Sequence, residues 1–158
     1  MRILFFTYTF ENVGFDPLNV MALSAVLKQR GHETEIIVDP KNREAVRGEL
    51  SSFKPDILAY SATTGMHRFF LDLNRDIRKE YGAFSIFGGP HPTFFPEVIN
   101  EPFVDAIGAG ECDTALADLA DALQSGANHT CIQNINVKLP DGTDVENSLR
   151  PLVENLDT

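Results

Sequence analysis

The stretch FGGPHPTFFPE, residues 87–97, ends an apolar run with two adjacent glycines and then places a histidine between two prolines. Each glycine weakens a strand or helix by roughly 0.5–1 kcal/mol relative to alanine. Two explanations are open: a tight turn that needs positive φ, or a bare ledge of backbone against which a ligand lies. Gly89 and His91 each precede proline, which favours extended backbone. We therefore expect residues 88–92 to be extended and not to run straight into a helix N-terminus.

This apolar run is one of five that alternate with helical patterns along the chain. The runs are almost continuously apolar, which is typical of strands covered on both faces of a parallel sheet. They lie at residues 2–9, 34–39, 56–61, 84–89 and 104–110. The intervening stretches are long enough for crossover helices, so the sequence predicts an α/β fold with a doubly wound, parallel, five-stranded sheet. We expect this domain to span residues 1–128, followed at 129–158 by a small C-terminal β-hairpin and a linker.

Apolar residues at helical spacing mark the connecting helices. Residues 66–81 and 116–126 carry clear stripes, and a weaker helix ends near Phe53. In the first helix, residues 17–30, we expect the stripe Leu18, Met21, Ala22, Ala25 and Val26 to face the core. The opposite side of this helix is also apolar, with Val20, Leu23 and Leu27, which suits a helix covered on two sides.

Composition and charge exclude several classes of protein. The net charge is −10, and residues 97–158 hold 12 acidic but only two basic residues. Without a basic patch, nucleic-acid binding is not expected. No apolar run approaches the ~20 residues of a membrane span. Cys112 and Cys131 are far apart and unaccompanied, which favours reduced thiols and a cytoplasmic location.

In an open parallel sheet, ligands bind beyond the carboxyl ends of the strands. That rule selects the loops at residues 7–17, 61–68, 88–95 and 108–114. It leaves His32 at the opposite edge, where we expect a surface histidine, and we expect His67 to be exposed. Thr63 or Thr64 either hydrogen-bonds a ligand or caps the following helix.

Motifs for independent catalysis are absent from the sequence. No GxGxxG follows the first strand, and neither HExxH, GxSxG nor paired cysteines occur. We therefore expect no metal ligands and no catalytic residues in this chain, and a domain that holds a ligand.

Taken in order, the loops resemble a known family: the N-terminal cobalamin-binding domain of B12-dependent radical SAM enzymes. The matching segments are RILFF, LNVMALSAVLKQRGHETEIIV, FKPDILAYSATT, FGGPHPTFFPE, VDAIGAGE and RPLVENLD. They span nearly the whole chain. The resemblance implies the Rossmann-like, flavodoxin-like B12-binding fold, and a parent enzyme with a radical SAM barrel. That barrel would carry a 4Fe-4S cluster and S-adenosylmethionine, whereas this chain has no CxxxCxxC motif.

The resemblance also implies how cobalamin would lie. The corrin would cover the carboxyl ends of the strands, with Gly88-Gly89 lining the path of the nucleotide tail and Ser61-Ala62-Thr63 contacting it. The DxHxxG motif, whose histidine binds cobalt in methionine-synthase-type domains, is absent after the first strand. A histidine ligand to cobalt from that loop is therefore not expected. The candidate cofactor-binding residues are Thr9, Phe10, Glu11, Asn12, Gly14, Ser61, Ala62, Thr63, Thr64, His67, Gly88, Gly89, Pro90, His91, Gly108, Gly110 and Glu111.

Three functions follow as hypotheses. The first is a cobalamin-binding module of a radical SAM enzyme, a methyltransferase or a ring-forming catalyst, whose methylcobalamin donates methyl to a substrate radical made in the barrel. The second is a flavodoxin-like module for a flavin or nucleotide, which the missing phosphate loop disfavours. The third is a scaffold domain that has lost cobalamin and packs against the barrel.

Overall fold

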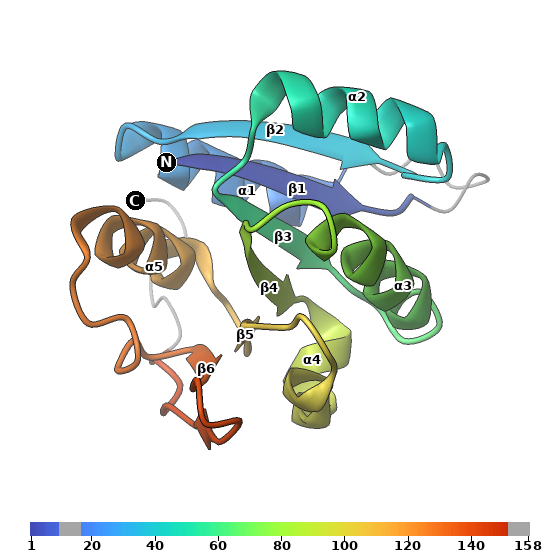
Figure 1. Ribbon diagram of the computed structural model, residues 1–158. Helices are drawn as coiled ribbons and strands as arrows, with labels where there is room; N and C mark the ends of the chain where they lie inside the picture. Colours follow the sequence, from blue (N-terminus) through green and yellow to red (C-terminus); the bar gives the residue numbers. More distant parts are fainter. Residues whose placement is uncertain (10–16, 152–158) are drawn as a thin grey trace.

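Seven strands form one sheet, in the order β2-β1-β3-β4-β5-β6-β7, in the computed structural model, which describes residues 1–9 and 17–151 (Figure 1). The strands are β1 (Arg2–Thr7), β2 (Glu33–Val38), β3 (Ile57–Ser61), β4 (Phe84–Gly88), β5 (Ala106–Gly108), β6 (Ile135–Lys138) and β7 (Asp144–Val145). Between them lie α1 (Leu18–Gln29), α2 (Arg43–Phe53), α3 (His67–Arg78), α4 (Pro90–Phe94), the 3-10 helix η1 (Pro96–Asn100) and α5 (Asp113–Ser125).

The predicted parallel sheet is confirmed for β1 to β5. The predicted hairpin differs in its position. Its strand β6 pairs antiparallel with β5, and β7 pairs antiparallel with β6, so the hairpin continues the same sheet and raises the strand count from five to seven. The order of the strands reverses between β1 and β3, which makes the carboxyl ends of these strands the topological switch point.

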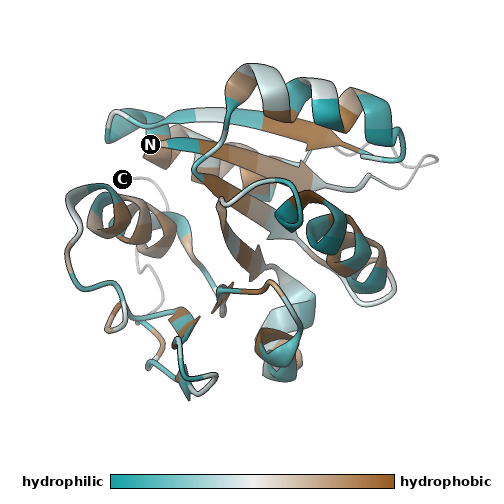
Figure 2. Cartoon of the chain, viewed as in Figure 1, coloured by the Kyte–Doolittle hydropathy of each residue, from teal (hydrophilic) through white to brown (hydrophobic). Residues whose placement is uncertain are grey.

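Two hydrophobic clusters cover the two faces of the sheet. Because successive side chains of a strand alternate between faces, Phe5 belongs to one cluster and Phe6 to the other. Helices α1 and α5 contribute to the cluster that contains Phe5, and α2 and α3 to the cluster that contains Phe6. In Figure 2 the central strands are correspondingly hydrophobic along their length. The sheet is therefore buried on both sides, as a doubly wound fold requires.

Helix α1 faces the core with the side that the sequence had assigned to the outside. Val20 and Leu27 are fully buried, whereas Leu18 and Met21 are 70% and 48% exposed. The helix is apolar around most of its circumference, so its periodicity identified a helix but not which side packs on the sheet. The expected core stripe is thus wrong, and an apolar surface remains on the outer side of α1.

Residues 88–92 also differ from expectation, because α4 begins directly after β4. Gly89 has φ +96° and turns the chain, and Pro90 occupies the first helical position. Proline is favourable there because the first backbone N–H groups of a helix have no intrahelical partner. Pro92 is tolerated for the same reason, so the preference of pre-proline residues for extended backbone is overridden at His91.

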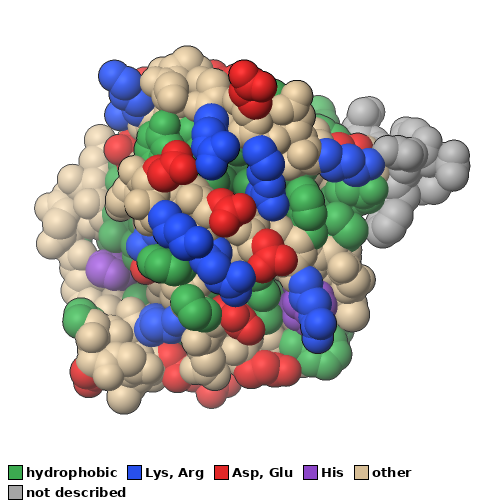
Figure 3. Space-filling model, turned by 45° about the vertical axis from the view of Figure 1, so that its right-hand side comes forward, with side chains coloured by type: hydrophobic (Ala, Val, Ile, Leu, Met, Phe, Trp, Pro, Cys, Tyr) green, Lys and Arg blue, Asp and Glu red, His purple; other side chains and the backbone are tan. Residues whose placement is uncertain are grey.

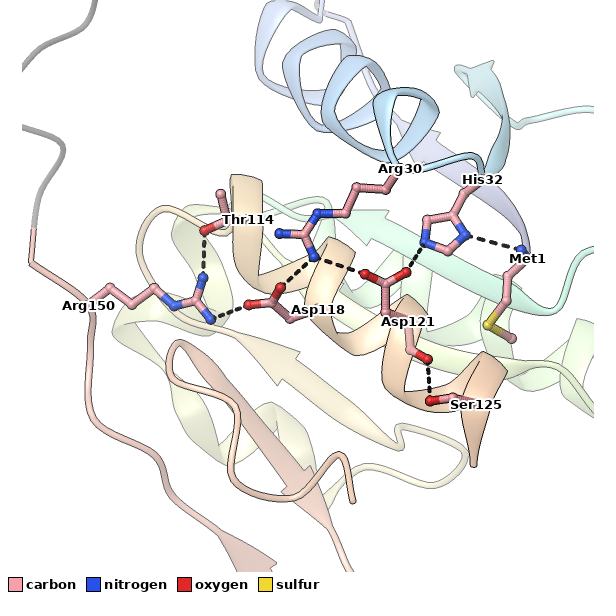
Figure 4. Close-up of polar contacts among 8 residues, drawn as sticks. All are labelled: Met1, Arg30, His32, Thr114, Asp118, Asp121, Ser125 and Arg150. Carbon is pink, nitrogen blue, oxygen red and sulfur yellow. Dashed lines mark hydrogen bonds and ion pairs between the residues drawn. The ribbon is translucent and has the colours of Figure 1, made fainter. Parts of the chain in front are cut away.

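His32 is buried, contrary to the expectation of a surface histidine. Its side chain accepts a hydrogen bond at Nδ1 from the Met1 amino group at 3.1 Å, and Nε2 lies 3.0 Å from Oδ1 of Asp121 on α5 (Figure 4). Arg30 donates to Asp118 at 2.6 Å and to Asp121 at 2.9 Å. This network ties the end of α1 to α5.

The outer surface carries both signs of charge. Lysine and arginine side chains alternate with aspartate and glutamate across the face shown in Figure 3. Within residues 1–9 and 17–151, none of the helices has the length and apolar character needed to cross a bilayer.

Candidate functional site

A cavity of about 520 Å³ opens at the carboxyl ends of the parallel strands, between the sheet, α1 and α5. That size is within the range of small-molecule and cofactor sites. The lining residues are Phe5, Asn19, Val20, Ala22, Leu23, Ala59, Tyr60, Ser61, Ile86, Gly88, Gly89, Pro90, Thr93, Phe94, Gly108, Gly110, Glu111, Cys112, Asp113 and Leu116.

Strand pleating explains which residues line the cavity. Ala59 and Ile86 lie in the cluster on the α1 and α5 side, so Ser61 and Gly88, two positions further along, are on the same face of the sheet. The same alternation places Gly108 on that face of β5. The cavity therefore has an apolar floor and, about 6–7 Å nearer to solvent, a rim of small residues.

The two adjacent glycines have different tasks. A Cβ on Gly88 would meet no atom within 4 Å, so its missing side chain leaves open space. A Cβ on Gly89 would lie 2.9 Å from the carbonyl oxygen of Ala62, and the residue has φ +96°. Backbone hydrogen bonds from Ala62 to Gly88 and from His91 to Ala62 hold the two turns together, at 2.8 and 3.0 Å. Gly89 is thus the tight turn, and Gly88 leaves open space at the rim of the cavity.

Thr93 connects two of the glycine-containing loops at the rim. Its hydroxyl donates to the carbonyl of Gly89 at 2.9 Å and accepts from the backbone N–H of Gly110 at 3.1 Å. Both hydrogen-bonding roles of this side chain are therefore used to fix the distance between the loop after β4 and the loop after β5. Sequence reasoning did not select Thr93, because its partner Gly110 belongs to another loop and its bond to Gly89 depends on the unexpected helix α4.

The loop after β5 is also held by the segment that precedes β6. Asn134 donates through Nδ2 to the carbonyls of Ala109 and Glu111, at 2.8 and 3.0 Å. Its Oδ1 accepts from the backbone N–H of Arg150 at 2.8 Å. The C-terminal segment therefore supports the rim of the cavity, a role that no local sequence signal indicated.

Polar side chains meet at the mouth where α1 approaches β3. Asn19 donates through Nδ2 to the hydroxyl oxygen of Ser61 at 3.0 Å. Because Ser61 accepts this bond, its own proton is free to be donated to a ligand. The Oδ1 atom of Asn19 adds one acceptor beside it. Asn19 was missed by the sequence analysis because α1 was expected to present its other side.

The charged residues that line the cavity are Glu111 and Asp113, and none of the described lining residues is a lysine, arginine or histidine. Burial raises the pKa of the neighbouring Cys112 thiol to about 12, so it is protonated at neutral pH. The cavity therefore disfavours anions within it and suits a neutral ligand group.

The structure brings together only part of the predicted set. Ser61, Gly88, Gly89, Pro90, Gly108, Gly110 and Glu111 line the cavity. Thr9, Ala62, Thr63, Thr64, His67 and His91 do not line it. Phe10, Glu11, Asn12 and Gly14 lie outside the described residues.

His67 and His91 form a separate cluster beside the rim. Their rings stack with centroids 3.7 Å apart, and Nδ1 of His91 is 3.2 Å from the hydroxyl of Thr64. His67 is therefore partly buried, not exposed as expected. Burial, reinforced by the field of His67, lowers the pKa of His91, while Glu97 acts in the opposite direction. Neither Thr63 nor Thr64 caps α3 through its side chain.

Comparison with known proteins gives this geometry a family. The family model named B12 binding domain matches residues 10–120. The chain is 28% identical over 147 residues to an uncharacterized methyltransferase, PH0819, of Pyrococcus horikoshii. That alignment covers 89% of this chain and 32% of the relative.

Two solved structures share the fold. The radical S-adenosylmethionine methyltransferase TsrM from Kitasatospora setae, with cobalamin and a 4Fe-4S cluster bound, superposes with a TM-score of 0.75 at 17% identity. The cobalamin-dependent S-adenosylmethionine radical enzyme OxsB, with aqua-cobalamin bound, gives 0.80 at 19% identity. The alignments cover 89% and 95% of this chain but 29% and 22% of those proteins.

This chain therefore spans about a third or less of the proteins it matches. Because the family model covers more than half of the chain, and because the cavity lies where the fold places a ligand, we conclude that this chain belongs to the B12-binding domain family.

Proposed function

We propose that this domain binds cobalamin with its nucleotide tail in the cavity between α1 and α5 and its corrin over the carboxyl ends of the strands. The observation that carries the proposal is Gly88. This residue lines the cavity, has no positive φ, and would meet no atom within 4 Å with an added Cβ, so the open space beside it supports a role in ligand binding. The resemblance to cobalamin-binding domains supports the same placement, because in that family a Gly-Gly pair like Gly88-Gly89 lines the path of the nucleotide tail.

The residues of this chain bind and orient; they carry out no chemical step. Gly88 leaves room for the tail, Ser61 has a free donor for it, and Thr93 holds the rim. Cobalamin, once bound, supplies a methyl group carried on cobalt, or takes part in a ring-forming reaction. Phe94 lines the cavity and is 77% exposed, so it would contact a corrin that covers the mouth.

We further propose that the parent protein is a radical SAM enzyme in which a barrel domain lies against this one. The support is that the matched relatives are roughly three or more times longer than this chain. The hairpin β6-β7 belongs to the sheet of the domain, so the linker toward the barrel would begin after it and not at residue 129. Arg150 binds Asp118 of α5 at 2.6 Å and so anchors the start of that path. The two free cysteines support a cytoplasmic location.

A flavin mononucleotide or another nucleotide is the less suitable ligand. Its phosphate would need N–H donors or cations, and the described lining of the cavity offers two carboxylates instead. The helix after β1, where such a phosphate would lie in related folds, begins without a glycine-rich turn of the GxGxxG type.

The proposal is tested by titration of the purified chain with hydroxocobalamin, followed by desalting and an absorption spectrum. We expect the chain to retain cobalamin. The Gly88→Leu protein should bind it at least about tenfold more weakly, because the leucine side chain would occupy space that the tail needs, and a loss of about 1.4 kcal/mol in binding free energy is a factor of ten in affinity. Gly48→Leu is the matched control, because Gly48 lies on α2, across the sheet, with open space around it. Equal retention by both variants would contradict the proposal.

A further inference from the structure

The cavity differs in chemistry between its mouth and its floor. At the mouth, the described side chains that form a hydrogen-bonded polar pair are Asn19 and Ser61, 3.0 Å apart. At the floor lie Phe5, Ala59 and Ile86, all at most 4% exposed. The walls continue the apolar surface with Val20, Leu23 and Leu116. A group that enters fully therefore meets polar partners at its outer edge alone.

Charge restricts which part of a nucleotide tail enters. Glu111 and Asp113 are exposed at the mouth on the side of α5. A phosphodiester is negatively charged and finds no cation among the described lining residues, so it stays at the solvent side. The part that enters the cavity is then the neutral base at the end of the tail.

The hydrogen-bonding capacity of the mouth matches one kind of base. Because Asn19 donates to Ser61, the hydroxyl proton of Ser61 is the donor that remains for a ligand. A benzimidazole base has one unsubstituted ring nitrogen, an acceptor next to its ribose, and an apolar far edge. Adenine has an exocyclic amino group and further ring nitrogens, which at the floor would lose water without gaining a partner.

We propose that this cavity selects cobamides by their lower base, accepting an apolar benzimidazole and discriminating against a purine such as adenine. The inference rests on the proposed function, because it assigns the specificity of the same cavity. Ser61, held by Asn19, then donates a hydrogen bond to the ring nitrogen of the base. The apolar floor packs against the opposite edge of the base.

Equilibrium dialysis of the full 158-residue chain against three ligands tests this inference. The ligands are cobalamin with its dimethylbenzimidazole base, the otherwise identical cobamide with adenine, and cobinamide, which lacks the nucleotide tail. We expect the dimethylbenzimidazole form to bind at least about tenfold more tightly than the adenine form, since each buried polar atom without a partner costs a factor of about that size. Cobinamide should bind more weakly than the dimethylbenzimidazole form.

Two variants assign the selectivity to the floor and to the tail. Ala59→Ser adds a hydroxyl to the floor and should reduce the ratio of the affinity for the dimethylbenzimidazole form to that for the adenine form. Gly48→Leu, on the far side of the sheet, should leave this ratio unchanged. In Gly88→Leu, cobalamin and cobinamide should bind alike, because the tail no longer enters. Equal affinity for the two bases, with cobinamide binding more weakly than both, would overturn this inference alone. Cobinamide binding as tightly as cobalamin would contradict the placement of the tail in the cavity, and with it both the proposed function and the inference. Binding of none of the three by folded protein would overturn the proposed function and the inference with it.

Discussion

At the scale of single residues, the adjacent glycines Gly88 and Gly89 differ in backbone conformation and in the space around them. Both explanations were open in the sequence, because two glycines look the same whether the backbone or a ligand needs them. The structure supports the turn explanation at Gly89, and a ligand role for Gly88 is our proposal. Gly88 has ordinary backbone angles and open space, whereas Gly89 combines positive φ with close approach to Ala62. The stability of alanine variants should show this division directly.

We expect Gly89→Ala to lower the free energy of unfolding by about 1–3 kcal/mol, since its backbone is strained for any side chain and its Cβ would contact the Ala62 carbonyl. Gly88→Ala should leave that free energy unchanged or raise it by up to about 1 kcal/mol. Urea unfolding followed by circular dichroism measures both. A Gly89→Ala protein as stable as the Gly88→Ala protein would show that the turn is not required.

At the scale of elements, the alternation of strands and helices could be predicted, because apolar runs and helical stripes are local in sequence. The packing side of α1 could not, since Leu18 and Val20 are both apolar and periodicity alone does not tell them apart. Helix α4 was missed because rules for single residues before proline cannot anticipate a glycine that turns the chain into a helix. Partners from distant parts of the chain explain why Asn19, Thr93 and Asn134 were also missed: Asn19 bonds to Ser61, Thr93 to Gly110, and Asn134 to the loop after β5.

Helix α4 positions the rim through Thr93, which hydrogen-bonds to Gly89 and Gly110. Thr93→Val keeps the shape of the side chain but removes both bonds, so we expect hydroxocobalamin to bind about fivefold to tenfold more weakly and stability to fall by about 1 kcal/mol. Thr93→Ser keeps the hydroxyl and should restore most of the affinity. Dialysis and urea unfolding of the three proteins compare the two effects. If Ser fails to rescue affinity, the hydroxyl does not position the rim.

At the scale of the whole molecule, buried histidines make stability depend on pH. Burial and the nearby N-terminal ammonium lower the pKa of His32, although Asp121 opposes them, and burial lowers the pKa of His91. The unfolded chain therefore binds more protons than the folded one below about pH 6.5. The contribution of these two histidines to the free energy of unfolding is therefore fully present above about pH 6.5 and is lost as the pH falls below that value.

Urea unfolding between pH 8 and pH 5.5 should accordingly give a free energy of unfolding that decreases toward the acidic end. His32→Gln should reduce this decrease, because glutamine has no proton to gain. The ion pairs of Arg30 and Arg150 with Asp118 do not interfere in this range: burial raises the pKa of Asp118, but hydrogen bonds from the two arginines outweigh it and leave the pKa below its usual value. A free energy that is constant or larger at pH 5.5 would contradict the assignment.

We propose for the whole molecule that the base of cobalamin would lie in the cavity, where it could not at the same time bind cobalt. Electron paramagnetic resonance of the chain loaded with cobalamin and reduced to cob(II)alamin tests it most directly, because a nitrogen bound to cobalt splits the signal. We predict no splitting from the dimethylbenzimidazole nitrogen. A nitrogen splitting that stays unchanged when the protein is uniformly labelled with nitrogen-15 comes from the cofactor's own base, and would contradict the account.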